Sequence, residues 1–173
     1  MQKTKCIVSV FFSAVLALGF VTSERKIAQA QHSSGSVSLL RARCVDSGVG
    51  SVRDQNLDIS IGKAVYSSRF YLGPGSRYAS ITCNIKPINN DYQGFQTLNL
   101  GFGMRDNDRF SPGVQVKVYL DGKVVETRTV SPARQTSFSL NVNNISNVSI
   151  EAVCTSQSQY CDRVYFFDAS LGR

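Results

Sequence analysis

The stretch VQVKVYLDGKVV, residues 114–125, alternates apolar and polar side chains and is interrupted once, at Asp121-Gly122. Alternation with a period of two indicates a strand with one buried face. Asp-Gly is the pair that a two-residue type I′ turn prefers, because both central positions need positive φ. The stretch therefore predicts two antiparallel strands joined by a tight turn.

The same alternation recurs along the chain. It is found at Leu57–Ile61, Ala79–Ile85, Leu98–Phe102, Phe138–Val142 and Val148–Ala152. Turn-forming residues separate these runs, at 73–75, 89–91, 111–113, 131–132 and 143–144. No amphipathic pattern of ten residues indicates a helix. The pattern is typical of an all-β protein, an antiparallel β-sandwich or jelly roll, and we assign it to one domain over residues 37–173.

The first thirty residues read as a secretory signal peptide. Two lysines precede an apolar run over residues 6–21, and Ala28-Gln29-Ala30 provides a small-x-small cleavage site. Residues 31–36 are polar and read as a disordered leader. The apolar run is too short for a comfortable membrane span, so we expect a secreted or periplasmic protein with no stable membrane span after cleavage. An uncleaved N-terminal anchor is the alternative.

The charge of the chain argues against a nucleic-acid partner. The formal net charge of the 173 residues is +7, and it falls to +4 without residues 1–30, which hold four basic residues and one acid. In the remainder the signs are interspersed. Binding to nucleic acid needs a concentrated basic stripe, and none is visible. Attraction to an acidic polysaccharide or to a cell envelope is compatible with this charge.

The cysteines agree with export. Four remain after residue 30, and an even number in an exported protein predicts two disulfides. Three pairings are possible; we favour Cys154 with Cys161, across a short polar loop, and Cys44 with Cys83. The chain has no CxxC pair and a single histidine, His32, so we expect no metal, no cofactor and no histidine-dependent catalysis.

Four segments, in order, resemble the NPCBM family, a carbohydrate-binding module that accompanies certain glycoside hydrolases. They are Ile59–Tyr66, Phe95–Asp108, Val114–Val125 and Cys161–Leu171, which together span about residues 57–171. The resemblance implies a galactose-binding-like β-sandwich in which loops at one end contact sugars. The chain departs from the family in having no tryptophan, and no histidine after the opening motif.

Two groups of residues are predicted to bind carbohydrate. Tyr66, Arg69, Phe70 and Tyr71 border the turn at residues 73–75 and combine ring faces with a guanidinium donor. The second group is a dense polar cluster after a predicted strand. It consists of Arg105, Asp106, Asn107, Asp108 and Arg109. Carboxylates, an amide and guanidinium groups can hold vicinal hydroxyls.

Other interpretations of the polar cluster are a calcium site, which the flanking arginines oppose, and a solvated loop whose charges neutralise one another. A glycosidase pair of Asp106 and Asp108 lacks a further acid to raise one pKa, so we predict no enzyme. The favoured hypothesis is an exported, non-catalytic carbohydrate-binding domain whose glycan is unknown. The alternative is a protein-interaction or structural module on the same β-sandwich, with an envelope protein as partner and no sugar site.

Overall fold

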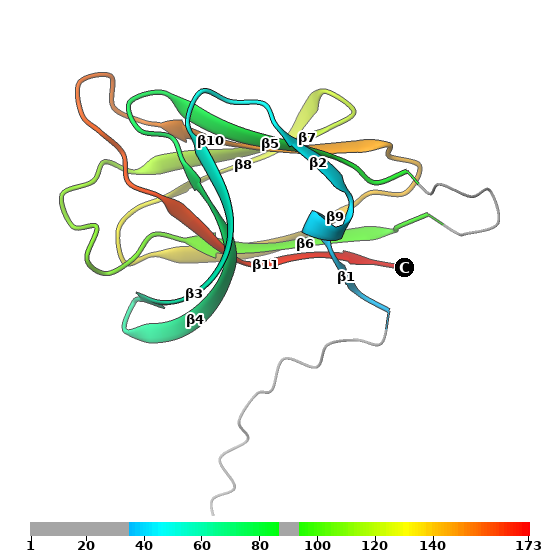
Figure 1. The fold of residues 1–173 in the computed structure, drawn as a ribbon, viewed down its shortest axis with the longest axis horizontal. Coiled ribbons are helices and arrows are strands. Elements are labelled where there is room, and N and C mark those ends of the chain that lie inside the picture. The colour runs from blue at the N-terminus through cyan, green and yellow to red at the C-terminus, as the bar shows by residue number, and fades with distance from the viewer. Residues whose placement is uncertain (1–34, 87–93) are drawn as a thin grey trace, which may run out of the picture. The chain divides into compact units, whose positions relative to one another are not determined.

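Two antiparallel sheets pack face to face in the computed structural model, which describes residues 35–86 and 94–173 (Figure 1). The first sheet has the order β3-β4-β11-β6-β9, with β1 also paired to β11, and the second has the order β2-β5-β10-β7-β8. The strands of the first sheet are β1 (Val37–Ser38), β3 (Ser51–Ile61), β4 (Ala64–Gly73), β6 (Thr97–Gly103), β9 (Gln135–Asn141) and β11 (Val164–Gly172). Those of the second are β2 (Arg43–Asp46), β5 (Tyr78–Asn84), β7 (Val114–Leu120), β8 (Lys123–Val130) and β10 (Asn147–Cys154). A short 3₁₀ helix, η1 (Leu39–Arg41), lies between β1 and β2. The predicted β-sandwich is confirmed.

The predicted hairpin at residues 114–125 is confirmed as β7 and β8. Both turn residues have positive φ, 45° at Asp121 and 81° at Gly122. Asp121 has a second role besides forming the turn. Its carboxylate also accepts hydrogen bonds from the backbone N–H groups of Ser146 and Asn147, at 3.2 and 2.8 Å from Oδ1. These two bonds lower the pKa of Asp121 and join the hairpin turn to the start of β10.

Phe166 lies at the centre of the core between the sheets. It pairs in register with Phe70 of β4 on one side and with Phe102 of β6 on the other. Its ring stacks on Phe70 with 4.4 Å between centroids and meets Phe102 at 5.2 Å. All three side chains are 0% exposed. Cross-strand aromatic pairs of this kind stabilise a sheet beyond the area they bury.

Both predicted disulfides are present. Cys44 and Cys83 are directly paired residues of β2 and β5, and their bond joins these neighbouring strands. Cys154 and Cys161 close the loop between β10 and β11. In the chain-entropy description the two bonds stabilise the fold by about 4 and about 2.5 kcal/mol respectively.

The predicted signal peptide and the predicted turn at residues 89–91 lie outside the described residues. Within the described part of the chain, no helix combines the length and the apolar character that crossing a membrane requires.

Replacing Phe166 by alanine should lower the free energy of unfolding by about 3–5 kcal/mol, because a large cavity opens in the core. Phe110 is the matched control, because this phenylalanine is 96% exposed. Phe110→Ala should change the free energy of unfolding by less than about 0.5 kcal/mol. Urea unfolding of both variants measures the difference. Equal losses would contradict the described core.

Candidate functional site

Three loops meet at one end of the sandwich, the left-hand end in Figure 1. They are the β4–β5 loop (residues 74–77), the β6–β7 loop (residues 104–113) and the β10–β11 loop (residues 155–163). Cys161 N–H donates to Gly75 O at 2.8 Å, and Thr155 N–H donates to Gly113 O at 3.2 Å. The Cys154–Cys161 disulfide closes the third loop at its base. The loops therefore form one hydrogen-bonded surface.

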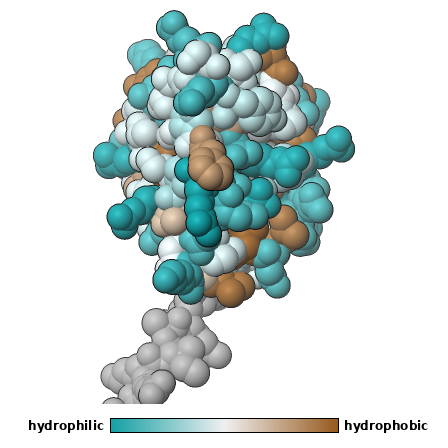
Figure 2. Space-filling view, turned by 90° about the vertical axis from the view of Figure 1, so that its left-hand side faces the viewer, coloured by the Kyte–Doolittle hydropathy of each residue, from teal (hydrophilic) through white to brown (hydrophobic). Residues whose placement is uncertain are grey.

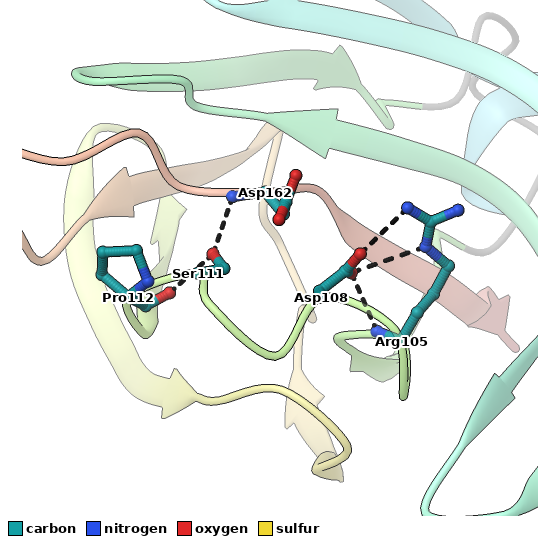
Figure 3. Close-up of polar contacts among 5 residues, drawn as sticks. All are labelled: Arg105, Asp108, Ser111, Pro112 and Asp162. Atoms are coloured by element: carbon teal, nitrogen blue, oxygen red, sulfur yellow. Dashed lines mark hydrogen bonds and ion pairs between the residues drawn. The ribbon is translucent and has the colours of Figure 1, made fainter.

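An ion pair organises the β6–β7 loop (Figure 3). The Arg105 guanidinium donates to Asp108 Oδ1 at 2.9 Å, and the Arg105 N–H donates to Asp108 Oδ2 at 3.1 Å. The Asp108 side chain is only 3% exposed and that of Arg105 is 27% exposed. Asp108 thus holds its own loop in shape and offers no free carboxylate to a ligand.

Asp106 fastens the loop to the β3–β4 hairpin. Its carboxylate accepts hydrogen bonds from the Ser60 hydroxyl at 2.5 Å, from Gly62 N–H at 2.6 Å and from Lys63 N–H at 3.0 Å. Gly62 and Lys63 are the two turn residues of this hairpin, with φ of 59° and 65°. Positive φ is costly for a lysine, so the carboxylate stabilises a turn that the sequence alone does not favour. The Ser60 hydroxyl foremost, and then the two N–H groups, lower the pKa of Asp106 against an opposing effect of desolvation.

Rings and guanidinium groups alternate beneath the loops. The Cζ atom of Arg105 lies 4.9 Å from the ring centroid of Tyr165, and that of Arg163 lies 4.6 Å from the ring centroid of Tyr71. The two rings are 5.6 Å apart. Tyr165 is 0% and Tyr71 8% exposed, so both rings are covered. Each arginine gains a cation–π contact while its exposed edge stays available for hydrogen bonding. Tyr165 also raises the pKa of Arg163.

Asp162 is the carboxylate of this end that remains without a side-chain hydrogen bond among the described residues. Its backbone N–H is held by Ser111 Oγ at 2.8 Å, and Ser111 in turn donates to Pro112 O (Figure 3). Burial, and then the nearby charge of Asp108, raise the pKa of Asp162, while Arg105 and Arg163 oppose this effect. The backbone of Asp162 is therefore held in place, and its half-buried carboxylate remains a hydrogen-bond acceptor without a side-chain partner among the described residues.

Phe110 and Tyr160 expose aromatic rings on the same loops. Phe110 is 96% and Tyr160 69% exposed. Figure 2 shows this end as a mostly hydrophilic face with separate hydrophobic side chains rather than a continuous apolar patch. Arg109 and Asn107 on the β6–β7 loop are also exposed. Exposed rings beside polar groups can stack on a ligand and hydrogen-bond to it.

The structure separates the two predicted groups of site residues. Phe70 is in the sandwich core and has no ring face for a ligand, because β4 alternates and points it inward. Tyr66 is partly buried, with its ring 4.5 Å from that of Phe167. Tyr71 lies under Arg163, at the loop end. Arg69 lines a different cleft, described below. From the first predicted group only Tyr71 joins the loops.

Sequence reasoning missed Phe110, Asp162 and Arg163 as candidate site residues. Phe110 had a usable signal, because it follows a polar cluster and stands outside any alternating run. Asp162 and Arg163 come directly after the second cysteine of the short disulfide. Their position at the loop end depends on how β11 enters the first sheet, which no local pattern reveals. In the described chain no three His, Cys, Asp or Glu side chains gather to hold a metal ion.

Solved carbohydrate-binding modules share this fold. The CBM51-2 and INT domains of Clostridium perfringens ZmpB, solved with GlcNAc, align with 80% of this chain at 16% identity and a TM-score of 0.63, and the aligned part is 31% of that chain. The CBM51 of Clostridium perfringens GH95, solved with methyl-galactose, aligns with 79% of this chain and 99% of its own at 14% identity and a TM-score of 0.62. The tandem CBM51 modules of Sp3GH98 from Streptococcus pneumoniae align with 80% of this chain and 47% of theirs at 10% identity and a TM-score of 0.60.

These likenesses confirm the galactose-binding-like β-sandwich that the resemblance implied. No protein-family profile matches the sequence, and no curated protein is similar to it in sequence.

The Asp106→Asn variant should be less stable than the wild type at neutral pH, because a neutral amide replaces the ionised carboxylate that accepts three hydrogen bonds. The folded-state pKa of Asp106 is lower than 3.8, so its stabilising effect is complete above that value and is lost as the pH falls through the lowered folded-state pKa. The difference between variant and wild type should therefore be constant from pH 7 to about pH 5 and shrink below pH 3.8.

Thermal unfolding at several pH values measures this difference. Asp46→Asn on the exposed face of β2 is the control, and it should leave the unfolding midpoint unchanged. If the difference in unfolding midpoint between Asp106→Asn and the wild type does not shrink below pH 3.8, the proposed role of the carboxylate is contradicted.

Proposed function

We propose that this protein binds a carbohydrate at the end of the β-sandwich where the three loops meet, as an exported and non-catalytic binding domain. The fold is that of carbohydrate-binding modules, which supports the class of function. The observation that carries the proposal for this surface is the Phe110 ring, 96% exposed on a loop held by hydrogen bonds.

Burying a phenylalanine ring would stabilise the fold by about 1.5–3 kcal/mol, and an exposed ring on an ordered loop does not contribute this energy. Such a ring suits the apolar C–H face of a sugar, which stacks on a flat aromatic surface. The hydrogen bonds of the Asp108 carboxylate to Arg105 fix the backbone that precedes the ring. The ring is therefore presented on a preorganised loop, which reduces the entropy lost on binding.

The polar groups around the ring match sugar hydroxyls. Asp162 is a hydrogen-bond acceptor, and Arg105, Arg109, Arg163 and Asn107 are donors on the same loops. A single hydrogen bond to a hydrated hydroxyl nets only about 1 kcal/mol, so binding needs several of them together with the ring. Asp106 and Asp108 position these groups and do not contact the sugar.

Export is part of the proposal. Two disulfides in the domain favour an oxidising compartment. The first thirty residues have the sequence pattern of a signal peptide. We infer that the signal is removed before Gln31 and that the domain acts in the periplasm or outside the cell.

A glycan array with the purified protein should identify at least one bound glycan, and Phe110→Ala should weaken its binding about 5- to 30-fold, because about 1–2 kcal/mol of ring contact is lost. Phe110→Trp, which keeps a flat ring, should bind at least as well as the wild type. Titration calorimetry with the best glycan measures both affinities.

Val65→Ala is the matched control, since Val65 is an exposed apolar residue, 77% exposed, at the tip of the β3–β4 hairpin. It should bind as the wild type does. Binding to no glycan would leave the protein-interaction module as the explanation of the fold. Binding indifferent to Phe110 would move the site away from these loops.

Purified protein from an exporting cell should begin at Gln31 and contain no free thiol under denaturing conditions. N-terminal sequencing and a thiol assay measure the two properties. Four reactive thiols in the exported chain would contradict the oxidising compartment, and an N-terminus at Met1 would contradict cleavage.

A further inference from the structure

A cleft lies on the side of the first sheet, away from the loop end. It has a volume of about 420 Å³ and is lined by Ser38, Leu40, Arg41, Asp54, Asn56 and Arg69. None of these residues belongs to the β6–β7 or β10–β11 loop. The volume is in the range of pockets that hold a small ligand.

A split in the sheet accompanies the cleft. On one side of β11, β4 pairs with residues 164–166 and β1 pairs with residues 170–171. Residues 167–169 of β11 have no strand partner on that side in the described structure. Ser38 and Arg69 stand at the two borders of this gap, at the end of β1 and where β4 leaves β11.

A β-bulge contributes a further part of the cleft. The register of β3 against β4 shifts between Asp54 and Leu57, and this irregularity includes Asn56, which lines the cleft together with Asp54. A second shift lies between Phe166 and Asp168 on β11. Bulges redirect side chains and are frequent next to functional sites.

The charged groups of the cleft are not used internally. Arg41, Arg69 and Asp54 come from η1, β4 and β3, and all three are exposed. None of them has an ion-pair partner within 4.0 Å or a side-chain hydrogen bond among the described residues. Two guanidinium groups and one carboxylate give the lining a net charge of +1.

We propose that this cleft binds a sugar residue that carries a carboxylate, as a uronic acid does, at a site separate from the loop end. A planar carboxylate matches the fork of a guanidinium group. A carboxylate in the cleft meets two guanidinium groups and one carboxylate, so its net interaction with the charges of the lining is attractive. Asp54 accepts a hydrogen bond from a ring hydroxyl, Asn56 donates a hydrogen bond to another hydroxyl or accepts one from it, and Leu40 contacts the apolar face of the sugar.

Titration calorimetry with an oligogalacturonide at moderate salt tests the proposal. Wild type should bind, and Arg41→Gln and Arg69→Gln should each weaken binding at least about tenfold, because each removes one charge-assisted hydrogen bond of the carboxylate. The double variant should not bind. A neutral galactose oligomer of equal length should bind at least about tenfold more weakly than the uronate, and a sulfated oligosaccharide should not bind more tightly than the uronate.

Two controls separate this site from other causes. Arg43→Gln removes the same charge from the exposed face of β2, outside the cleft, and should bind the uronate as the wild type does. Phe110→Ala should also leave uronate binding unchanged, so failure of the loop site and failure of the cleft are distinguishable. All variants should keep the wild-type unfolding midpoint.

Three outcomes would overturn the proposal. The first is wild-type affinity in the Arg41 and Arg69 variants. The second is an equal loss in Arg43→Gln, which would indicate general charge attraction. The third is tighter binding of the sulfated or neutral oligosaccharide than of the uronate.

Discussion

The central strand β11 carries large side chains on both faces, and this constraint shapes the end of the sandwich where the three loops meet. Phe166 faces the core between the sheets, where Phe70 and Phe102 cover it. Its neighbour Tyr165 therefore faces outward and needs a cover of its own, because an aromatic ring left in water forgoes about 1.5–3 kcal/mol of burial. Ile59 and Ile61 of the curled β3–β4 hairpin, together with Tyr71, supply this cover and form a second hydrophobic cluster outside the sandwich.

Covering Tyr165 requires two segments distant in sequence to meet, and Asp106 joins them. Its carboxylate is on the β6–β7 loop, and its hydrogen-bond donors are in the β3–β4 turn. Arg105 completes the cover over the Tyr165 ring and is held there by Asp108. The most charged segment of the sequence thus serves first to close the outer cluster. The groups of this segment that remain exposed to a ligand are the outer edges of Arg105 and Arg109, Asn107 and Phe110.

The extent to which the sequence predicts this structure follows from the range of each interaction. The β7–β8 hairpin was predictable, because alternation and Asp121-Gly122 act within a few residues. The Cys154–Cys161 pairing was predictable for the same reason. Which residues of β4 face the core was not predictable from the sequence. Phe70 and Tyr71 therefore looked equivalent, although they point to opposite faces of the sheet. The partners of Asp106 were out of reach, because a carboxylate that accepts from N–H groups 43 and 44 residues away has the same local sequence as one that faces water.

The two proposed binding surfaces carry different groups because loops converge at one of them and strands diverge at the other. At the loop end the sandwich brings opposite charges together, so Arg105 and Asp108 neutralise each other, and the exposed rings of Phe110 and Tyr160 stand among polar side chains. At the side cleft the strands diverge, and Arg41, Arg69 and Asp54 line it without forming an ion pair among the described residues. Charge that the fold does not pair stays hydrated and is available to an incoming ion. Where β4 diverges from β11, the surface therefore carries unpaired charges. Where the loops converge, it carries exposed aromatic rings on which a ligand can stack.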